Sequence, residues 1–190
     1  MILRTTGADV AEQAMTGNYV GIPYSRLDCQ GFVEQVLKDL GVRKEDGSPY
    51  NWKGSNSMYR NFIRWRGTLD ECLNKFGDIP KGAFLFIVKH DGGEVEKGYH
   101  DDLGNASHVG LYLVNGQCMD SQGNRGVDYC KLNIFTHVGL MSMIDYYYNE
   151  PIPPADDLLS AVHTLRDDSS SDSVWLKALK TLVKESTSWI

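Results

Sequence analysis

The chain has 190 residues, of which 42% are hydrophobic and 23% charged, and its formal net charge is −6 at pH 7. A chain of this length can bury a sizeable core, and we expect one domain of about 150 residues with an appendage. The acidic balance argues against nucleic acid as the main partner.

The first residues contain no basic segment followed by an apolar run, and no stretch approaches the roughly 20 apolar residues of a membrane span. We therefore predict no signal peptide and no membrane span. The expectation is a soluble, cytoplasmic product that other means must deliver if it acts at the cell wall.

Four cysteines are present, and they show neither C-x-x-C spacing nor a neighbouring histidine pair, so we predict no zinc site, no other metal and no cofactor. A cytosolic origin argues against disulfides. The cysteines are Cys29, Cys72, Cys118 and Cys130.

The helical signals begin near the N-terminus, where residues 8–15 fit a short helix. A loop over residues 21–27 then leads to a second helix, in which Asp28 is the predicted N-cap and Cys29 the first helical residue. Gly41 is its predicted C-cap. The apolar face of this helix follows three-and-four spacing through Phe32, Val33, Val36, Leu37 and Leu40.

Cys29 lies where the free N–H groups and the positive end of the helix dipole favour a thiolate over a thiol. This makes Cys29 a candidate nucleophile. The alternative is a buried cysteine that serves as a small apolar side chain.

Residues 57–66 carry apolar side chains near helical spacing, and we predict that Thr68 caps another short helix ending at Phe76. Basic residues in this region form a patch that either binds a substrate carboxylate or lies on a solvated helix face. They are Arg60, Arg64 and Arg66.

Strand signals dominate the middle of the chain, where Asn115-Gly116 marks a hairpin turn and residues 89–106 read as an exposed loop beside the site. Helices followed by sequential strands predict an α+β fold with an antiparallel sheet of about five strands. The predicted strands are residues 83–88, which form a central strand, 107–114, 117–121, 127–129 and 136–146.

Prolines at 151, 153 and 154 end the predicted domain, so we divide the chain into a domain over 1–150 and a tail over 151–190. The tail reads as two helices separated by an acidic, serine-rich linker. Its last helix has an apolar stripe that docks on its own domain, on a partner protein through residues 155–190, or on a membrane surface.

Four short motifs, in this order, resemble the NlpC/P60 family of papain-like cysteine peptidases, which cleave peptides of the bacterial cell wall. They are Gly21–Tyr24, Asp28–Val33, Gly77-Asp78 before an apolar strand, and Ser107–Leu113. The resemblance covers roughly residues 8–147. It implies a papain-like fold in which the nucleophile helix packs on the sheet.

The resemblance also implies roles for individual residues. Cys29 would be the nucleophile, His108 its base, and Asp120 the polar residue that orients the imidazole. Residues implied to bind substrate are Tyr24, Asp28, Gln30 and Ser107. Gln30 stands where many members carry a serine associated with recognising a free amine, so the sequence departs from a specificity for free N-terminal L-Ala.

The register of the hairpin decides which polar residue can reach His108. A regular two-residue turn places His108 opposite Gly123 and points Asp120 to the other face of the sheet. A three-residue loop or a single bulge places His108 opposite Gln122 and brings Asp120 onto its face. We therefore predict such an irregularity; a regular hairpin would leave Ser121 as the nearer candidate, with Gln122 as a fallback.

A second histidine repeats the motif, because His137-Val138-Gly139-Leu140 has the same four letters as the sequence that begins at His108. No hairpin partner with a polar group follows it. We therefore interpret His137 as a histidine at a strand end.

The resemblance implies a hydrolase that cuts the amide between D-glutamate and the diamino acid of peptidoglycan stem peptides. The absence of a signal and the proline-bounded tail favour a phage or prophage protein. Two alternatives stay open: an assembly or binding module whose catalysis is vestigial, and a related amidase or acyltransferase.

Overall fold

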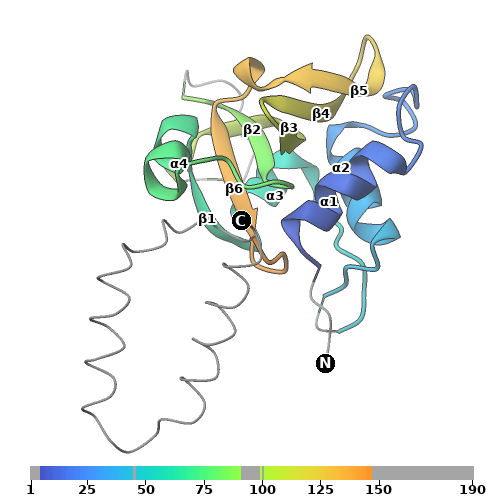
Figure 1. The fold of residues 1–190 in the computed structure, drawn as a ribbon, viewed down its shortest axis with the longest axis horizontal. Coiled ribbons are helices and arrows are strands. Elements are labelled where there is room, and N and C mark those ends of the chain that lie inside the picture. The colour runs from blue at the N-terminus through green and yellow to red at the C-terminus, as the bar shows by residue number, and fades with distance from the viewer. Residues whose placement is uncertain (1–4, 45, 91–98, 100, 147–190) are drawn as a thin grey trace, which may run out of the picture. The chain divides into compact units, whose positions relative to one another are not determined.

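The computed structural model describes residues 5–44, 46–90, 99 and 101–146 (Figure 1). The helices of this part are α1 (Gly7–Thr16), α2 (Cys29–Asp39), α3 (Gly54–Arg60), α4 (Leu69–Phe76) and the 3₁₀ turn η1 (Leu132–Ile134). The strands are β1 (Ile63–Thr68), β2 (Phe84–Lys89), β3 (Asn105–Val114), β4 (Gln117–Gln122), β5 (Gly126–Lys131) and β6 (His137–Met141).

The strands form one antiparallel sheet in the order β1-β6-β2-β3-β4-β5. The predicted α+β class and antiparallel sheet are confirmed, with six strands in place of about five. The run predicted as a central strand is β2, which lies between β6 and β3.

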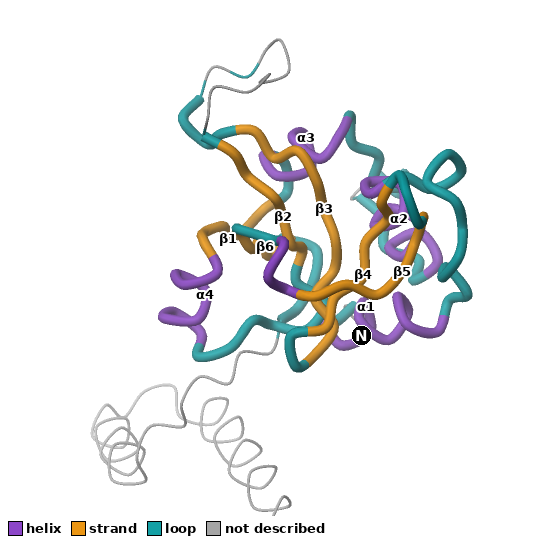
Figure 2. Tube along the Cα trace, turned by 90° about the horizontal axis from the view of Figure 1, so that it is seen from above, coloured by secondary structure: helices purple, strands orange, loops and turns teal. Residues whose placement is uncertain are grey.

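The helices cover different parts of the sheet (Figure 2). α1 and α2 pack against each other and against β3, and α2 also contacts β4, whereas α4 packs on β1 and β6. The predicted packing of the Cys29 helix on the sheet is therefore confirmed. Its core-facing side chains, Phe32, Val33, Val36 and Leu37, are fully buried, and each such burial contributes about 1.5–3 kcal/mol.

Local signals set both ends of α2. Asp28 is the N-cap as predicted, the helix ends at Asp39, and its C-cap is Leu40, one residue before the predicted Gly41, whose φ is +73°. Gly41 N–H donates to the Lys38 carbonyl and Val42 N–H to the Leu37 carbonyl, which is a Schellman motif. Glycine has no Cβ, so it enters this left-handed conformation without a steric cost.

The helix predicted over residues 57–66 is wrong in its second half. α3 ends at Arg60, Phe62 has a φ of +66°, and the chain then enters β1, which pairs with β6. The apolar spacing allowed a helix, but the hydrogen-bond ladder offered by β6, distant in sequence, stabilises a strand instead. The predicted cap at Thr68 is confirmed, with Glu71 completing a capping box.

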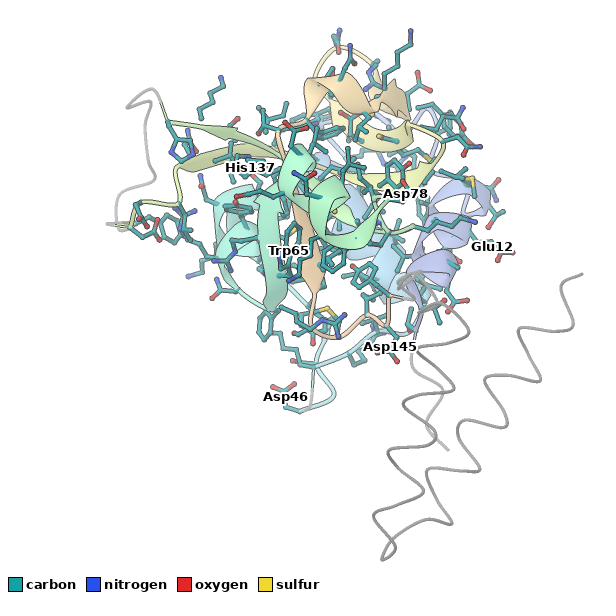
Figure 3. All side chains as sticks on the ribbon, turned by 60° about the vertical axis from the view of Figure 1, so that its left-hand side comes forward. Glu12, Asp46, Trp65, Asp78, His137 and Asp145 are labelled. Carbon is teal, nitrogen blue, oxygen red and sulfur yellow. The ribbon has the colours of Figure 1, made fainter. Side chains whose placement is uncertain are left out.

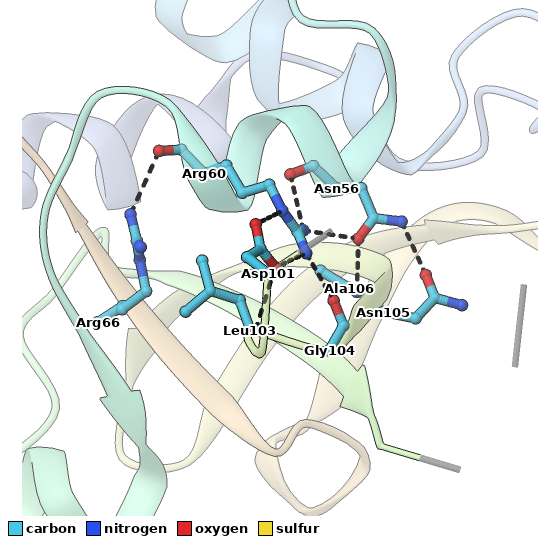
Figure 4. Close-up of polar contacts among 8 residues, drawn as sticks. All are labelled: Asn56, Arg60, Arg66, Asp101, Leu103, Gly104, Asn105 and Ala106. Atoms are coloured by element: carbon cyan, nitrogen blue, oxygen red, sulfur yellow. Dashed lines mark hydrogen bonds and ion pairs between the residues drawn. The ribbon is translucent and has the colours of Figure 1, made fainter. Parts of the chain in front are cut away.

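The basic patch is divided between elements, because Arg60 lies on α3 whereas Arg64 and Arg66 lie on β1. The Arg60 guanidinium forms a two-point ion pair with Asp101, at 2.8 Å from Nε and 2.7 Å from Nη2, and also donates to the Gly104 carbonyl (Figure 4). Arg60 therefore anchors the chain just before β3. It is neither a ligand for a substrate carboxylate nor part of a solvated helix face, the two roles predicted for the patch.

The β3–β4 hairpin has the predicted irregularity. Asn115 and Gly116 both have positive φ, as a two-residue turn requires, and Val114 pairs with Gln117. The register then shifts, so that Tyr112 pairs with Cys118 and Gly110 with Asp120. This single bulge brings Asp120 to the face of the sheet that His108 occupies.

Two predictions concern residues outside the described part of the chain: the tail over 151–190, and half of the loop over 89–106, whose first residue and last two residues belong to β2 and β3. Among the described helices, none has the length and apolar character needed to cross a bilayer.

Candidate active site

The first turn of α2 holds Cys29 in place. The Asp28 side chain accepts a hydrogen bond from Gly31 N–H at 2.6 Å, and its carbonyl accepts from Phe32 N–H at 2.9 Å. The carboxylate of Asp28, a predicted substrate-binding residue, is thus engaged as the helix cap. With Gly31 N–H bound to this cap, the N–H groups of Cys29 and Gln30 are the ones at the helix start that have no carbonyl one turn earlier in the helix, and such groups can face an anion beside Cys29.

The loop before Cys29 is fastened to the edge of the sheet. Gly21 N–H donates to the Val127 carbonyl and Val127 N–H donates to the Ile22 carbonyl, each at 2.9 Å. Gly126 permits this approach, because it has a φ of +70° and a Cβ there would lie 2.2 Å from the Ile22 oxygen. The loop is thereby held where it carries Tyr24 beside Cys29.

His108 lies on β3 and Asp120 on β4, and their side chains form a hydrogen bond of 2.8 Å between His108 Nε2 and Asp120 Oδ2. The His108 side chain is 14% exposed, whereas the Asp120 carboxylate is fully buried. Phe135 stacks on the imidazole, with ring centroids 6.0 Å apart and planes inclined by 14°. Strand register and stacking together fix the ring plane.

The Cys29 thiol influences the His108 imidazole. Burial lowers the pKa of His108, but hydrogen bonds to Asp120 and Cys29, with the charges of both, outweigh burial and raise the pKa to about 9. Because Nε2 is used by Asp120, Nδ1 is the nitrogen left for the Cys29 sulfur. The site thus combines a thiol, an imidazole that stays protonated into the alkaline range, and a buried carboxylate.

Tyr24 is a fourth residue of the site, beside Cys29, His108 and Asp120. Its pKa is raised by burial, by the charge and hydrogen bond of Cys29, and by the charge of Asp28. The phenol and the thiol therefore interact. Because Tyr24 is still 38% exposed, this side of the site reaches solvent.

Asp120 has further partners, which sequence reasoning did not assign. Gln122 Nε2 donates to Oδ2 at 2.9 Å, and Arg125 forms an ion pair with Oδ1. Burial raises the pKa of Asp120, but its bonds to His108 and Gln122 and the charge of Arg125 bring the pKa below its usual value. One sequence signal could have pointed to Arg125: it is a basic residue in the turn directly after the strand that carries Asp120.

The alternatives for the third polar residue have other contacts. Ser121 points to the opposite face of β4, where its hydroxyl donates to the Leu27 carbonyl at 2.5 Å. Gln122 contacts the Asp120 carboxylate, not the imidazole. Asp120 is therefore the one of the three that forms a hydrogen bond with His108 in the described part of the chain.

Two other predicted substrate-binding residues are engaged within the protein. The Gln30 amide donates to the Trp52 carbonyl at 2.5 Å and to Glu34 at 2.7 Å, and its oxygen accepts from Gly54 N–H. Gln30 thus ties α2 to the segment before α3. The Ser107 hydroxyl donates to the Ile87 carbonyl on β2 at 3.3 Å.

His137 begins β6, as predicted for a strand-end histidine, and is labelled in Figure 3. Its Nδ1 lies 2.9 Å from the Thr136 hydroxyl, and its ring is near those of Tyr59 and His90. Burial and the charge of His90 lower its pKa. These neighbours differ from those of His108, which include a thiol and a carboxylate.

The other cysteines are free thiols in other settings. Burial, with the charge of Asp78, raises the pKa of Cys72 to about 12. Cys118 and Cys130 face each other across β4 and β5, where their hydrogen bond and burial raise the pKa of Cys130. Cys72 is therefore a buried thiol of the kind that serves packing alone.

No family model matches the chain, and no curated protein matches it either. Solved structures do. The NlpC/P60 domain of the peptidoglycan hydrolase SagA is 19% identical, with a TM-score of 0.49, over 72% of this chain and all of that domain.

Two further structures are similar to this chain. An NlpC/P60 family protein from Bacillus cereus is 20% identical, with a TM-score of 0.49, over 76% of this chain and 42% of its own. The peptidoglycan hydrolase RipB of Mycobacterium tuberculosis is 20% identical, with a TM-score of 0.45, over 73% of this chain and 67% of its own. The chain is thus similar to NlpC/P60 domains, while its chemistry is inferred from its own side chains.

Proposed function

We propose that this protein is a cysteine peptidase that hydrolyses an amide bond in the stem peptides of peptidoglycan. The proposal is supported by the hydrogen bond of 2.8 Å between His108 and the buried Asp120, and by the effect of Cys29 on the pKa of the same imidazole. The substrate class comes from the resemblance of the sequence motifs to the NlpC/P60 peptidases. The specific bond we propose is the one between D-glutamate and the diamino acid.

Each group has a defined task in this proposal. The Cys29 thiolate attacks the amide carbonyl carbon, a C–S bond forms, and the carbonyl electron pair moves to oxygen, where N–H groups at the start of α2 stabilise it. His108 gives its proton to the leaving amine as the C–N bond breaks. Water, deprotonated by His108, then attacks the thioester carbonyl carbon, the C–S bond breaks, and the Cys29 thiolate and the His108 imidazolium are restored.

The geometry supports these tasks in two ways. An imidazolium is already present at neutral pH because the pKa of His108 is about 9, so the proton for the leaving amine is in place. Asp120 fixes which nitrogen faces the thiol, as the third member of a catalytic triad does. We further propose an association with a phage or prophage, which rests on the tail sequence over 151–190.

The test is incubation of purified muropeptides with the wild type and with Cys29→Ala. We expect new primary amines and a mass increase of one water across the products with the wild type, and none with Cys29→Ala. Cys72→Ala is the matched control, because it removes a buried thiol that does not contact His108, and it should retain hydrolysis.

The outcomes separate the alternatives. Hydrolysis that persists in Cys29→Ala contradicts a cysteine mechanism. A product that carries a second amine in place of water identifies an acyltransferase. If the wild type releases no amine and Cys29 alkylates no faster with iodoacetamide than a free thiol, the protein is a binding module and the proposal is wrong.

A further inference from the structure

Asp120 carries a full negative charge and has no contact with solvent. Its oxygens have separate partners: Oδ2 accepts from His108 at 2.8 Å and from Gln122 at 2.9 Å, while Oδ1 pairs with Arg125. Burying an unpaired carboxylate is strongly unfavourable. The identity of its counter-charge therefore matters for how the site works.

His108 cannot be that counter-charge throughout a reaction. When the imidazolium gives its proton to a leaving amine, it becomes neutral, and Asp120 would then be a buried anion with a neutral partner. Such a carboxylate would hold the proton on His108 and oppose the transfer. A second, permanent cation removes this difficulty.

Arg125 is placed to be that cation. It lies in the turn between β4 and β5, and its side chain is 25% exposed. Its Nη1 donates to the Tyr129 carbonyl at 3.2 Å and lies 3.8 Å from Asp128 Oδ2, which holds the guanidinium in one orientation. Because a guanidinium stays charged at all relevant pH values, its pairing with Asp120 does not depend on the state of His108.

We propose that Arg125 is a positioning residue that keeps Asp120 charge-compensated in both protonation states of His108, so that the carboxylate orients the imidazole without trapping its proton. The inference rests on the proposed function, whose proton transfer it serves. The other titratable or charged groups around this set are Cys29 and Tyr24 on the side of α2, and Cys130 and Asp128 on β5.

The test is an NMR titration of the His108 imidazole in the full chain, which needs no substrate. In Arg125→Gln the uncompensated carboxylate should raise the pKa of His108 by about one unit, a tenfold change in the protonation equilibrium. Arg125→Lys retains the charge and should stay near the wild type. Arg43→Gln, which removes an arginine that donates to backbone carbonyls at the end of α2, is the matched control.

A double-mutant cycle separates charge compensation from a structural role. In an Asp120→Asn background there is no carboxylate to compensate, so adding Arg125→Gln should leave the titration unchanged. An equal shift in both backgrounds, or no shift in Arg125→Gln alone, would overturn the inference.

Kinetics provides a second readout that a structural role would not imitate. The kcat for stem-peptide hydrolysis should fall at least about tenfold in Arg125→Gln and recover in Arg125→Lys, with little change in KM. If the titration cycle holds while no variant hydrolyses peptides, the proposed function is wrong and the role of Arg125 in compensating Asp120 stands.

Discussion

At the scale of single residues, His108 is held between two groups that favour its protonated form. Asp120 bonds to Nε2 and the Cys29 thiol interacts with the same ring, and together they outweigh the effect of burial on its pKa. A histidine titrating near pH 9 in place of 6.5 makes both chemistry and stability depend on alkaline pH.

The first prediction concerns activity against pH. Because the imidazolium supplies the proton for the leaving amine, kcat should stay high through neutral pH and fall as pH rises through about 9. Asp120→Asn removes a charge that holds the proton, so its alkaline limb should move to lower pH. A pH–rate profile with the same alkaline limb in both proteins would contradict this account.

The same shift predicts how stability changes. A group whose pKa is raised on folding stabilises the fold fully below its unfolded pKa, here 6.5, and that stabilisation is lost as pH rises through about 9. The difference corresponds to roughly 3 kcal/mol at most. Urea unfolding between pH 6 and 9 should show this loss in the wild type and a smaller one in Asp120→Asn.

At the scale of elements, the site depends on the junction between β5 and the loop that carries Tyr24. Backbone hydrogen bonds join Val127 to Gly21 and Ile22. Gly126 has no Cβ, so the Ile22 carbonyl can approach it closely. The β3–β4 bulge is the second such device, because it alone determines that Asp120 shares a face with His108. The junction and the bulge are both features of the backbone, and both position side chains of the site without contributing a side chain themselves.

Gly126→Ala tests the junction. The new methyl group would overlap the Ile22 carbonyl at a position with φ of +70°, so we expect a loss of at least about 1 kcal/mol of stability and slower alkylation of Cys29. Gly123→Ala is the matched control, since nothing lies within 4 Å of a Cβ there. Equal effects of the two substitutions would contradict the role given to Gly126.

In the molecule as a whole, the two ends of the described domain are joined by hydrogen bonds. Gly7 N–H donates to the Asp145 carbonyl and Asp145 N–H donates to the Thr5 carbonyl, which joins the start of α1 to the chain beyond β6. Tyr146 is buried, and its hydroxyl lies 3.4 Å from the Gly82 carbonyl. The core therefore extends from one end of this domain to the other.

This closure predicts that a protein comprising residues 1–150 folds by itself. Its thermal midpoint should lie within about 3 °C of that of the full chain, which corresponds to ~1 kcal/mol. Its rate of Cys29 alkylation should also match, because every contact described for the site lies before residue 147. A truncated protein that unfolds at a much lower temperature would show that residues 151–190 belong to the folding unit.

The features that depend on neighbouring residues could be predicted from the chain alone. The N-cap at Asp28, the C-terminal Gly41, the cap at Thr68 and the turn at Asn115 follow from local backbone preferences, which act whatever the rest of the fold does. The bulge was also predictable, because the motifs required His108 and Asp120 to share a face and strand alternation alone placed them apart.

The features that depend on partners far away in the sequence could be seen only in the folded protein. β1 is a strand because β6 lies beside it, Gln30 is engaged by the segment around Trp52, and Arg60 on α3 forms an ion pair with Asp101 just before β3. A hydrogen-bond ladder or a buried ion pair takes its energy from a group elsewhere in the chain. The spacing of neighbouring residues does not indicate which distant group will be the partner, so these contacts could not be predicted before the fold was known.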